Sequence, residues 1–152
     1  MTLHELRVAA TAQQILDLGR EMTMESRFAR LGFDETLARA FAEKILALPA
    51  VIGYGLFTPE GELVGMIVGT CSAALPWTDA MVAQQTLLFI TPRQRSPWQA
   101  AKLIEAFIEE AKNRGARDIT FSNGTGYQPE RVGKLFEICG LPRIGGLYAL
   151  EV

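Results

Sequence analysis

The feature that most constrains the fold of this chain is a change of periodicity in residues 90–107, which read ITPRQRSPWQAAKLIEAF. Before Pro92 the sequence is a continuous apolar run typical of a buried strand, and after Pro97 apolar residues recur at helical spacing. A buried strand that leads within a few residues into an amphipathic helix requires that helix to pack against the sheet. We therefore expect a layered fold of the α/β or α+β class.

The rest of the sequence divides into similar strand and helix signals. Strands are expected over residues 3–9, 51–57, 62–70, 81–91, 117–122 and 145–152, and helices after Thr11, Asp34, Ser96 and Gln128. The predicted order is β-α-α-β-β-β-α-β-α-β. We expect a single domain over residues 1–152, with a mixed sheet of about six to seven strands flanked by about four helices on both faces.

Local signals fix several boundaries. Thr11-Ala-Gln-Gln14 forms a capping box at the start of the first helix. Asp34 can cap a second helix, which Pro49 ends and whose apolar stripe is expected to face the core: Leu37, Phe41, Ile45 and Leu48. The residues Thr58-Pro59-Glu60-Gly61 are a strong hairpin signal.

Composition narrows the classes of function. A formal net charge of -2 and a pI near 5.5 argue against nucleic acid as a partner. His4 is the only histidine, and Cys71 and Cys139 lack metal-ligand spacing, so we expect no metal. No apolar run reaches membrane-spanning length and no signal peptide is evident, so a cytoplasmic protein without a membrane partner is expected. A mean hydropathy of +0.14 leaves room for a homodimer surface.

The loop before the third helix admits two interpretations. Ser96-Pro97-Trp98-Gln99 is a capping box with proline at the first helical position. A helix that begins directly after a central strand directs its free amides at the strand's carboxyl end, where anions bind favourably. The ordinary interpretation is a well-capped helix start that binds nothing.

The wider order of elements resembles the GNAT superfamily of acyl-CoA-dependent N-acetyltransferases over nearly the whole chain. The family's long fourth strand, arginine-rich loop and third helix are similar to residues 84–111, and its hairpin to residues 51–69, with Gly65. Its closing helix is similar to residues 135–141, LFEICGL. The glycine-rich stretch Asn123-Gly124-Thr125-Gly126, which we interpret as a turn, is similar to GNAT-like proteins of phages and prophages.

This resemblance implies acetyl-CoA as co-substrate and a direct transfer of the acyl group to a primary amine, on a small molecule or a protein. The pantetheine arm would add to the exposed backbone of Leu88, Phe89 and Ile90, as a strand adds to a sheet. Backbone amides of the same strand would stabilise the oxyanion. The pyrophosphate would be held by the loop and first helical turn: Arg95, Ser96, Pro97, Trp98, Gln99 and Ala100.

The sequence also departs from the family pattern. Trp98 replaces a glycine that lets phosphate approach the backbone, and Pro97 supplies no N–H. Gln84 stands where many members of the family have a glutamate that acts as the general base. Phe136 stands where they have a tyrosine that acts as the general acid. We therefore predict Glu25 as the proton acceptor, and we expect the proton donor among the tyrosines: Tyr148 is the predicted residue and Tyr127 the alternative.

Three functions remain open at this point. The first is an acyl-CoA-dependent N-acyltransferase, favoured because this chemistry depends on positioning more than on a single acid or base. The second is a catalytically silent GNAT-like protein with an interaction or structural role, for example in a phage particle. The third is a domain that binds CoA as a sensor without turnover.

Overall fold

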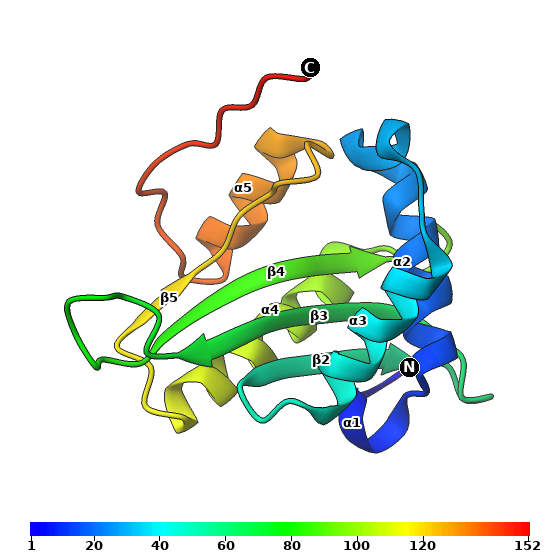
Figure 1. The fold of residues 1–152 in the computed structure, drawn as a ribbon, viewed down its shortest axis with the longest axis horizontal. Coiled ribbons are helices and arrows are strands. Elements are labelled where there is room, and N and C mark those ends of the chain that lie inside the picture. The colour runs from blue at the N-terminus through cyan, green and yellow to red at the C-terminus, as the bar shows by residue number, and fades with distance from the viewer.

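The computed structural model describes all 152 residues, which form one five-stranded sheet with helices on both faces (Figure 1). In chain order the elements are β1 Thr2–Glu5, α1 Leu6–Ala9, α2 Ala12–Glu25, the 3-10 turn η1 Arg27–Leu31, α3 Glu35–Ala47, β2 Val51–Phe57, β3 Leu63–Ser72, β4 Val82–Ile90, α4 Pro97–Asn113, β5 Asp118–Thr120 and α5 Pro129–Ile138. The mixed α/β layer fold predicted from the sequence is confirmed.

The strands lie in the order β1-β2-β3-β4-β5. The first four are antiparallel neighbours, and β5 alone runs parallel to its neighbour β4. Because a parallel pair needs a crossover, α4 must leave the end of β4 and pack across the sheet before β5 begins. This connection places the loop of residues 91–96 at the carboxyl end of β4.

Each face of the sheet has its own core. Helices α1, α2 and α3 cover one face, where the buried residues are Leu6, Ile15, Leu18, Ala42, Ile45, Val51, Phe57, Leu63, Met66, Val68 and Phe89. Helix α4 covers the other face, where they are Ile52, Leu56, Val64, Ile67, Cys71, Ala83, Ile90, Leu103, Ile104, Phe107 and Ala111. None of the helices combines the length and the apolarity needed to cross a membrane.

The predicted helix starts are confirmed. The Thr11 side chain accepts a hydrogen bond from the Gln14 amide, and the Gln14 side chain accepts one from the Thr11 amide. Asp34 caps α3 through the Leu37 amide, and Ser96 caps α4 through the Gln99 amide. The Gln99 side chain returns no bond to Ser96, so only half of the predicted capping box is present. These bonds satisfy amides that have no partner inside their helices.

One predicted strand is shorter than expected and another is absent. The first ends at Glu5, because Leu6 starts a helical turn that buries its side chain completely. Residues 145–152 form no strand, so the sheet has five strands rather than six or seven. A strand needs a neighbouring ladder, and the three paired residues of β5 provide too short an edge for it.

The predicted apolar stripe of α3 is also mostly wrong. Only Ile45 is buried, whereas Leu37, Phe41 and Leu48 are exposed. Helix α3 packs mainly on α2 at the edge of the helical layer. Only a narrow face of α3, with Ala42 and Ile45, therefore reaches the core, and the rest of the stripe faces outward. Exposed apolar side chains on this helix become relevant below.

Candidate functional site

The two halves of β4 have different neighbours. Residues Val82 to Gln84 pair with β3 on one side and with β5 on the other, where Gln84 lies opposite Thr120. Beyond Gln84 the pairing with β5 stops, while pairing with β3 continues to Ile90. Figure 1 shows β5 and the following chain diverging from β4 at this point. The carboxyl half of β4 therefore has an unpaired edge inside the sheet.

A β-bulge lies where the strands separate. Leu87 pairs with Val68 and Gln85 with Gly69, which leaves Thr86 as the extra residue in β4. The Thr86 hydroxyl donates to the Val68 carbonyl oxygen at 3.1 Å and so fixes the bulge. An extra residue bends its strand and increases the local twist, which accounts for the divergence from β5.

Gln85 bridges the two strands at the start of the gap. It is the only polar side chain in the buried set, at 6% exposure, and its Oε1 accepts a hydrogen bond from the Ser122 amide at 3.1 Å. The side chain thus satisfies an amide that has lost its strand neighbour. From the sequence, Gln84 was aligned with the general-base position of the family, but Gln84 is exposed and lies in the half of β4 that pairs on both sides. Gln85 was not identified from the sequence.

The direction of the backbone groups along the open edge follows from the ladder. The Thr91 amide donates to the Val64 carbonyl oxygen at 2.9 Å, so Thr91 faces β3. Because antiparallel residues alternate between facing and turning away, Phe89 also faces β3, whereas Leu88 and Ile90 face the open edge. Of the three residues predicted to meet pantetheine, only Leu88 and Ile90 direct backbone groups toward the gap.

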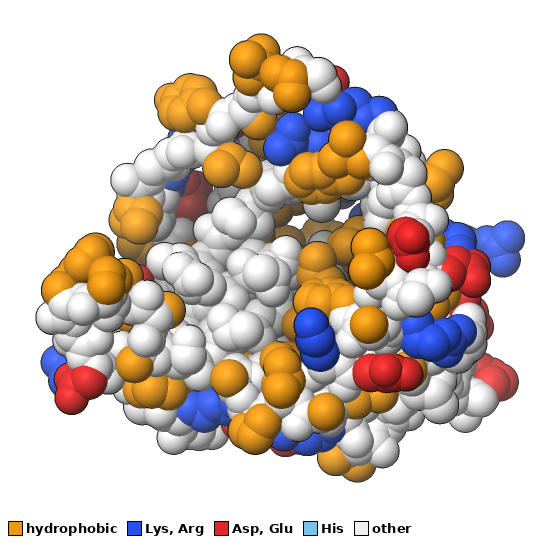
Figure 2. All heavy atoms as spheres, in the orientation of Figure 1, with side chains coloured by type: hydrophobic (Ala, Val, Ile, Leu, Met, Phe, Trp, Pro, Cys, Tyr) orange, Lys and Arg blue, Asp and Glu red, His pale blue; other side chains and the backbone are white.

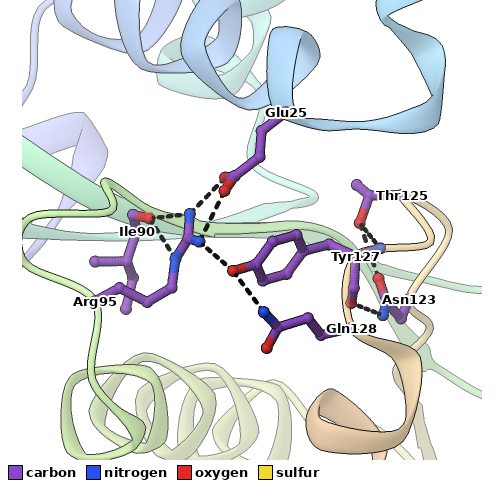
Figure 3. Close-up of polar contacts among 7 residues, drawn as sticks. All are labelled: Glu25, Ile90, Arg95, Asn123, Thr125, Tyr127 and Gln128. Atoms are coloured by element: carbon purple, nitrogen blue, oxygen red, sulfur yellow. Dashed lines mark hydrogen bonds and ion pairs between the residues drawn. The ribbon is translucent and has the colours of Figure 1, made fainter.

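Arg95 closes the far end of this gap (Figure 3). Its Nε and one terminal nitrogen donate to the Ile90 carbonyl oxygen at 3.0 and 2.9 Å. The terminal nitrogens also donate to both carboxylate oxygens of Glu25, at 2.9 and 2.5 Å. One of them reaches the Tyr127 hydroxyl at 2.8 Å. We call Glu25, Arg95 and Tyr127 the mouth cluster.

The mouth cluster joins three distant parts of the chain: the end of α2, the loop after β4 and the loop before α5. The guanidinium also lies over the rings of Tyr127 and Phe89, at 4.7 and 5.4 Å from their centroids. The hydrogen bond to Glu25 is the main cause that raises the pKa of Arg95, so this side chain stays cationic. Figure 3 shows the side chain of Arg95 pointing toward Glu25 and Tyr127.

Tyr127 has an unused donor. Its hydroxyl oxygen accepts hydrogen bonds from Arg95 and from the Gln128 side-chain amide, at 2.8 and 3.1 Å. A phenolic oxygen has two lone pairs and one hydrogen, so with both lone pairs occupied the O–H can still donate. The structure does not bring Tyr148, the predicted donor, to this cluster: its side chain is 94% exposed on the segment after α5.

The first turn of α4 has free amides beside the mouth cluster. The backbone N–H groups of Arg95, Ser96 and Trp98 donate to no protein acceptor, while those of Gln99 and Ala100 are used by Ser96. The Trp98 side chain does not fill this place, because it is 71% exposed and lies beside the Lys102 ammonium group. The buried Oε1 of Gln99 accepts no hydrogen bond. Such an atom is stabilised when a bound molecule supplies a donor.

The space-filling view places these features around one depression. Figure 2 shows the molecule hollowed over the carboxyl half of β4, between the end of α2 and the segment that contains α5 and the C-terminus. Arg30 of η1 and Glu151 near the C-terminus form an ion pair of 3.4 Å across the top of this depression. No three His, Cys, Asp or Glu side chains group together as metal ligands would.

Comparisons with known proteins agree with this geometry at the level of the fold. No protein-family model matches the sequence, and no curated protein matches it either. Among solved structures, the chain is similar to an acetyltransferase from Trypanosoma brucei, with 13% identity, a TM-score of 0.73 and 99% of each chain covered.

Two other solved structures are similar over the same extent. One is aminoglycoside N-acetyltransferase AAC(6')-Iy in complex with CoA, with 15% identity, a TM-score of 0.72, and 99% of this chain and 93% of that chain covered. The other is a transcriptional regulator from Bacillus halodurans, with 17% identity, a TM-score of 0.77 and 99% of each chain covered. The chain therefore has the fold of GNAT acetyltransferases, which confirms the fold expected from the sequence.

Proposed function

We propose that this protein is an acyl-CoA-dependent N-acyltransferase that uses acetyl-CoA and a primary amine. The observation that supports it most is the open edge of β4, where Leu88 and Ile90 direct backbone groups into a depression beside free amides at the start of α4. A pantetheine arm contains two amides in an extended chain and can add to such an edge as a strand does. The free amides of Arg95, Ser96 and Trp98 are donors for its pyrophosphate.

The reaction needs few groups from the protein. The amine nitrogen attacks the thioester carbonyl carbon, a C–N bond forms, and the C–S bond breaks with its electron pair remaining on sulfur. The ammonium form of the substrate loses one proton before attack, and the nitrogen loses a second proton as the amide forms. The leaving thiolate takes up one proton, so one proton is released to solvent overall. Backbone N–H groups on the open edge stabilise the negative charge on the carbonyl oxygen during this step.

The mouth cluster is proposed to handle the protons. Glu25 is the proposed acceptor of the ammonium proton, and because both of its oxygens bind Arg95, the pair has to loosen for this transfer. Tyr127, rather than the distant Tyr148, is the proposed donor to the thiolate, since its O–H has no acceptor in the protein. Arg95 would position both groups without touching the reacting atoms.

Calorimetry with acetyl-CoA tests the proposal most simply, followed by an assay of free thiol release with a panel of primary amines. Saturable binding together with amine-dependent thiol release supports the transferase. Absence of binding at millimolar acetyl-CoA would overturn it. Arg95→Glu breaks the mouth cluster and places a second carboxylate beside Glu25 at the open edge, so it should weaken binding of the anionic cofactor while the fold is retained.

Two observations favour a function without acyl transfer. The Glu25–Arg95 ion pair closes the mouth of the gap, and a similar fold occurs in a protein described as a transcriptional regulator. A domain that binds CoA without turnover, or a silent interaction or structural protein, would have these features. Binding of acetyl-CoA without thiol release would favour the sensor, and no binding the silent protein. A cytoplasmic location, a phage origin and a homodimer remain predictions from the sequence.

A further inference from the structure

Two adjoining hollows lie between α2 and α3 on the face of the sheet that carries Leu87. The deeper one has a volume of about 130 Å³ and ends on the sheet at Met66 and Leu87. The outer one, of about 490 Å³, extends toward η1 and the start of α3. Thr23 and Phe33 line both, so the two hollows form one groove. We call this the α2–α3 groove.

The deeper part of the groove is apolar, whereas the outer part has a mixed lining that includes Thr23, Gly32 and Asp34. The lining of the deeper part is Ile15, Leu16, Gly19, Met22, Thr23, Phe33, Ala38, Phe41, Met66 and Leu87, of which eight are hydrophobic. The outer part adds Leu31 and Leu37, whose side chains are 65% and 71% exposed. Leu37 and Phe41, which the predicted apolar stripe wrongly placed in the core, thus line the groove.

The charges around the groove do not suit a polycation. Asp34 is the only carboxylate in its lining, and its Oδ1 already accepts the Leu37 amide as the cap of α3. The Arg20 guanidinium lies over the Phe33 ring at 5.4 Å and pairs with Glu35. The deeper part of the groove is lined by no charged side chain, so a second ammonium group there would lose its water without gaining a counter-ion.

The inner end of the groove is next to the site where the acyl group would be held. Leu87 directly follows the bulge residue Thr86 and directly precedes Leu88, whose backbone faces the open edge of β4. Glu25 follows Thr23 by two residues on α2. The groove therefore adjoins the carboxyl half of β4 along both α2 and β4, so an amine whose apolar part lies in it can reach that half with its nitrogen.

We propose that the α2–α3 groove binds the apolar part of the acceptor, which is then a primary amine on one aromatic ring or on a chain of about four to five carbons. This inference rests on the proposed transferase function and names its substrate class. The deeper volume is close to the roughly 150 Å³ of a dry apolar protein cavity that admits benzene. A cavity of that size and lining favours a ring or a short chain over water.

The experiment compares amines that differ only in the apolar part. With acetyl-CoA saturating, kcat/KM should rise about fourfold for each methylene from methylamine to butylamine, which is the fold-change equal to roughly 0.8 kcal/mol of buried CH₂. Phenethylamine should react better than spermidine. Equal rates across the series, or a preference for spermidine, would overturn the proposal while leaving the transferase itself intact.

Variants and a binding readout separate this proposal from the transferase function. Leu37→Glu should lower kcat/KM for phenethylamine more than tenfold and raise it for spermidine, since it adds a carboxylate to the outer groove. Leu48→Glu at the C-cap of α3 is the control, because Leu48 is also an exposed leucine and lies outside the groove, so its rates should stay unchanged.

Binding is measured independently of turnover by methyl NMR of Leu37 and Leu87 during titration with phenethylamine. Saturable shifts at both residues support the groove even if acetyl-CoA proves not to bind. No shift would overturn it. If Leu37→Glu instead dissociates a dimer and leaves the amine preference unchanged, the groove is a surface for a second copy, and the proposal fails.

Discussion

The two halves of β4 contain similar shares of apolar residues but have different neighbours. The amino half, Val82 to Gln84, has a strand on each side, and its backbone groups are satisfied within the sheet. The carboxyl half has β3 on one side and a depression on the other. One extra residue, Thr86, separates the two halves, with Gln85 holding β5 where the separation begins.

The difference indicates how a sheet can contain a binding edge without losing stability. The closed half anchors β5, and through it the loop that contains Tyr127, at a fixed distance from β4. The open half leaves backbone donors and acceptors for an extended ligand. Changes in the closed half should therefore lower the free energy of unfolding, whereas changes at the open half should alter binding and turnover.

The largest effect on stability is expected at Gly69, opposite Gln85. A Cβ at this position would lie 2.1 Å from the Gln84 carbonyl oxygen and 2.7 Å from the Phe107 ring. Because a backbone oxygen cannot move aside without breaking the β3–β4 ladder, Gly69→Ala should lower the free energy of unfolding by about 3 kcal/mol or more. Chemical denaturation measures this. Gly19→Ala, which meets no atom within 4 Å in α2, is the control and should be neutral or slightly stabilising.

Glu25→Gln should affect turnover and leave the fold almost unchanged. If Glu25 accepts the ammonium proton, kcat/KM should fall by about 10²-fold or more and the acidic limb of the pH–rate profile should change. Its ion pair with Arg95 is partly exposed, so only a small change in stability is expected. Glu110→Gln, which breaks the ion pair with Arg114 on α4, is the control.

Whether Glu25→Gln changes kcat or KM distinguishes between the possible roles of Glu25. A change confined to KM that diminishes at high salt would mean that Glu25 only attracts the cationic amine. An unchanged rate across the pH range would remove it from the mechanism and leave proton transfer to water.

Gln85→Leu should have a smaller but measurable effect on stability. The variant leaves the Ser122 amide without its acceptor at the point where β4 and β5 separate, and the loss of this part-buried hydrogen bond costs about 0.5–1.5 kcal/mol. Thermal unfolding followed by circular dichroism is the measurement, with Gln84→Leu in the exposed neighbour as control. Equal melting temperatures for the two variants would contradict the bridging role.

The smallest effect is expected for the segment after α5. Removing residues 145–152 should change the free energy of unfolding by less than about 0.5 kcal/mol, because these residues form no strand and their apolar side chains are exposed. Denaturation of the truncated and full chains tests this. A loss of several kcal/mol would mean that the segment pairs with the sheet, as its sequence pattern predicted.

Local signals in the sequence predicted the fold well because they act over a few residues. The caps at Thr11 and Ser96, and the strand-to-helix change around Pro97, depend only on neighbours and appear where expected. The last strand was wrong because alternation indicates β-propensity, while a ladder also needs an edge of matching length. No local signal reports the length of β5.

The site was less predictable because it depends on contacts far apart in the chain. Glu25 and Arg95 are separated by 70 residues, and nothing in either segment indicates that they pair. The bulge at Thr86 has no glycine to mark it, yet it reverses which face of the sheet each later side chain of β4 meets. Its position decides that Leu88 and Ile90, and not Phe89, have backbone groups at the open edge.

The most direct test of the central claim is residue-resolved amide hydrogen exchange in β4, with and without acetyl-CoA. The amides of Leu87 and Phe89 face β3, so they should exchange slowly in both conditions. The amides of Leu88 and Ile90 should exchange quickly in the free protein and about 100-fold more slowly with ligand at 100 times its Kd. Bound acetyl-CoA, verified by calorimetry, that left Leu88 and Ile90 unprotected would contradict the claim that the open edge of β4 is the binding site.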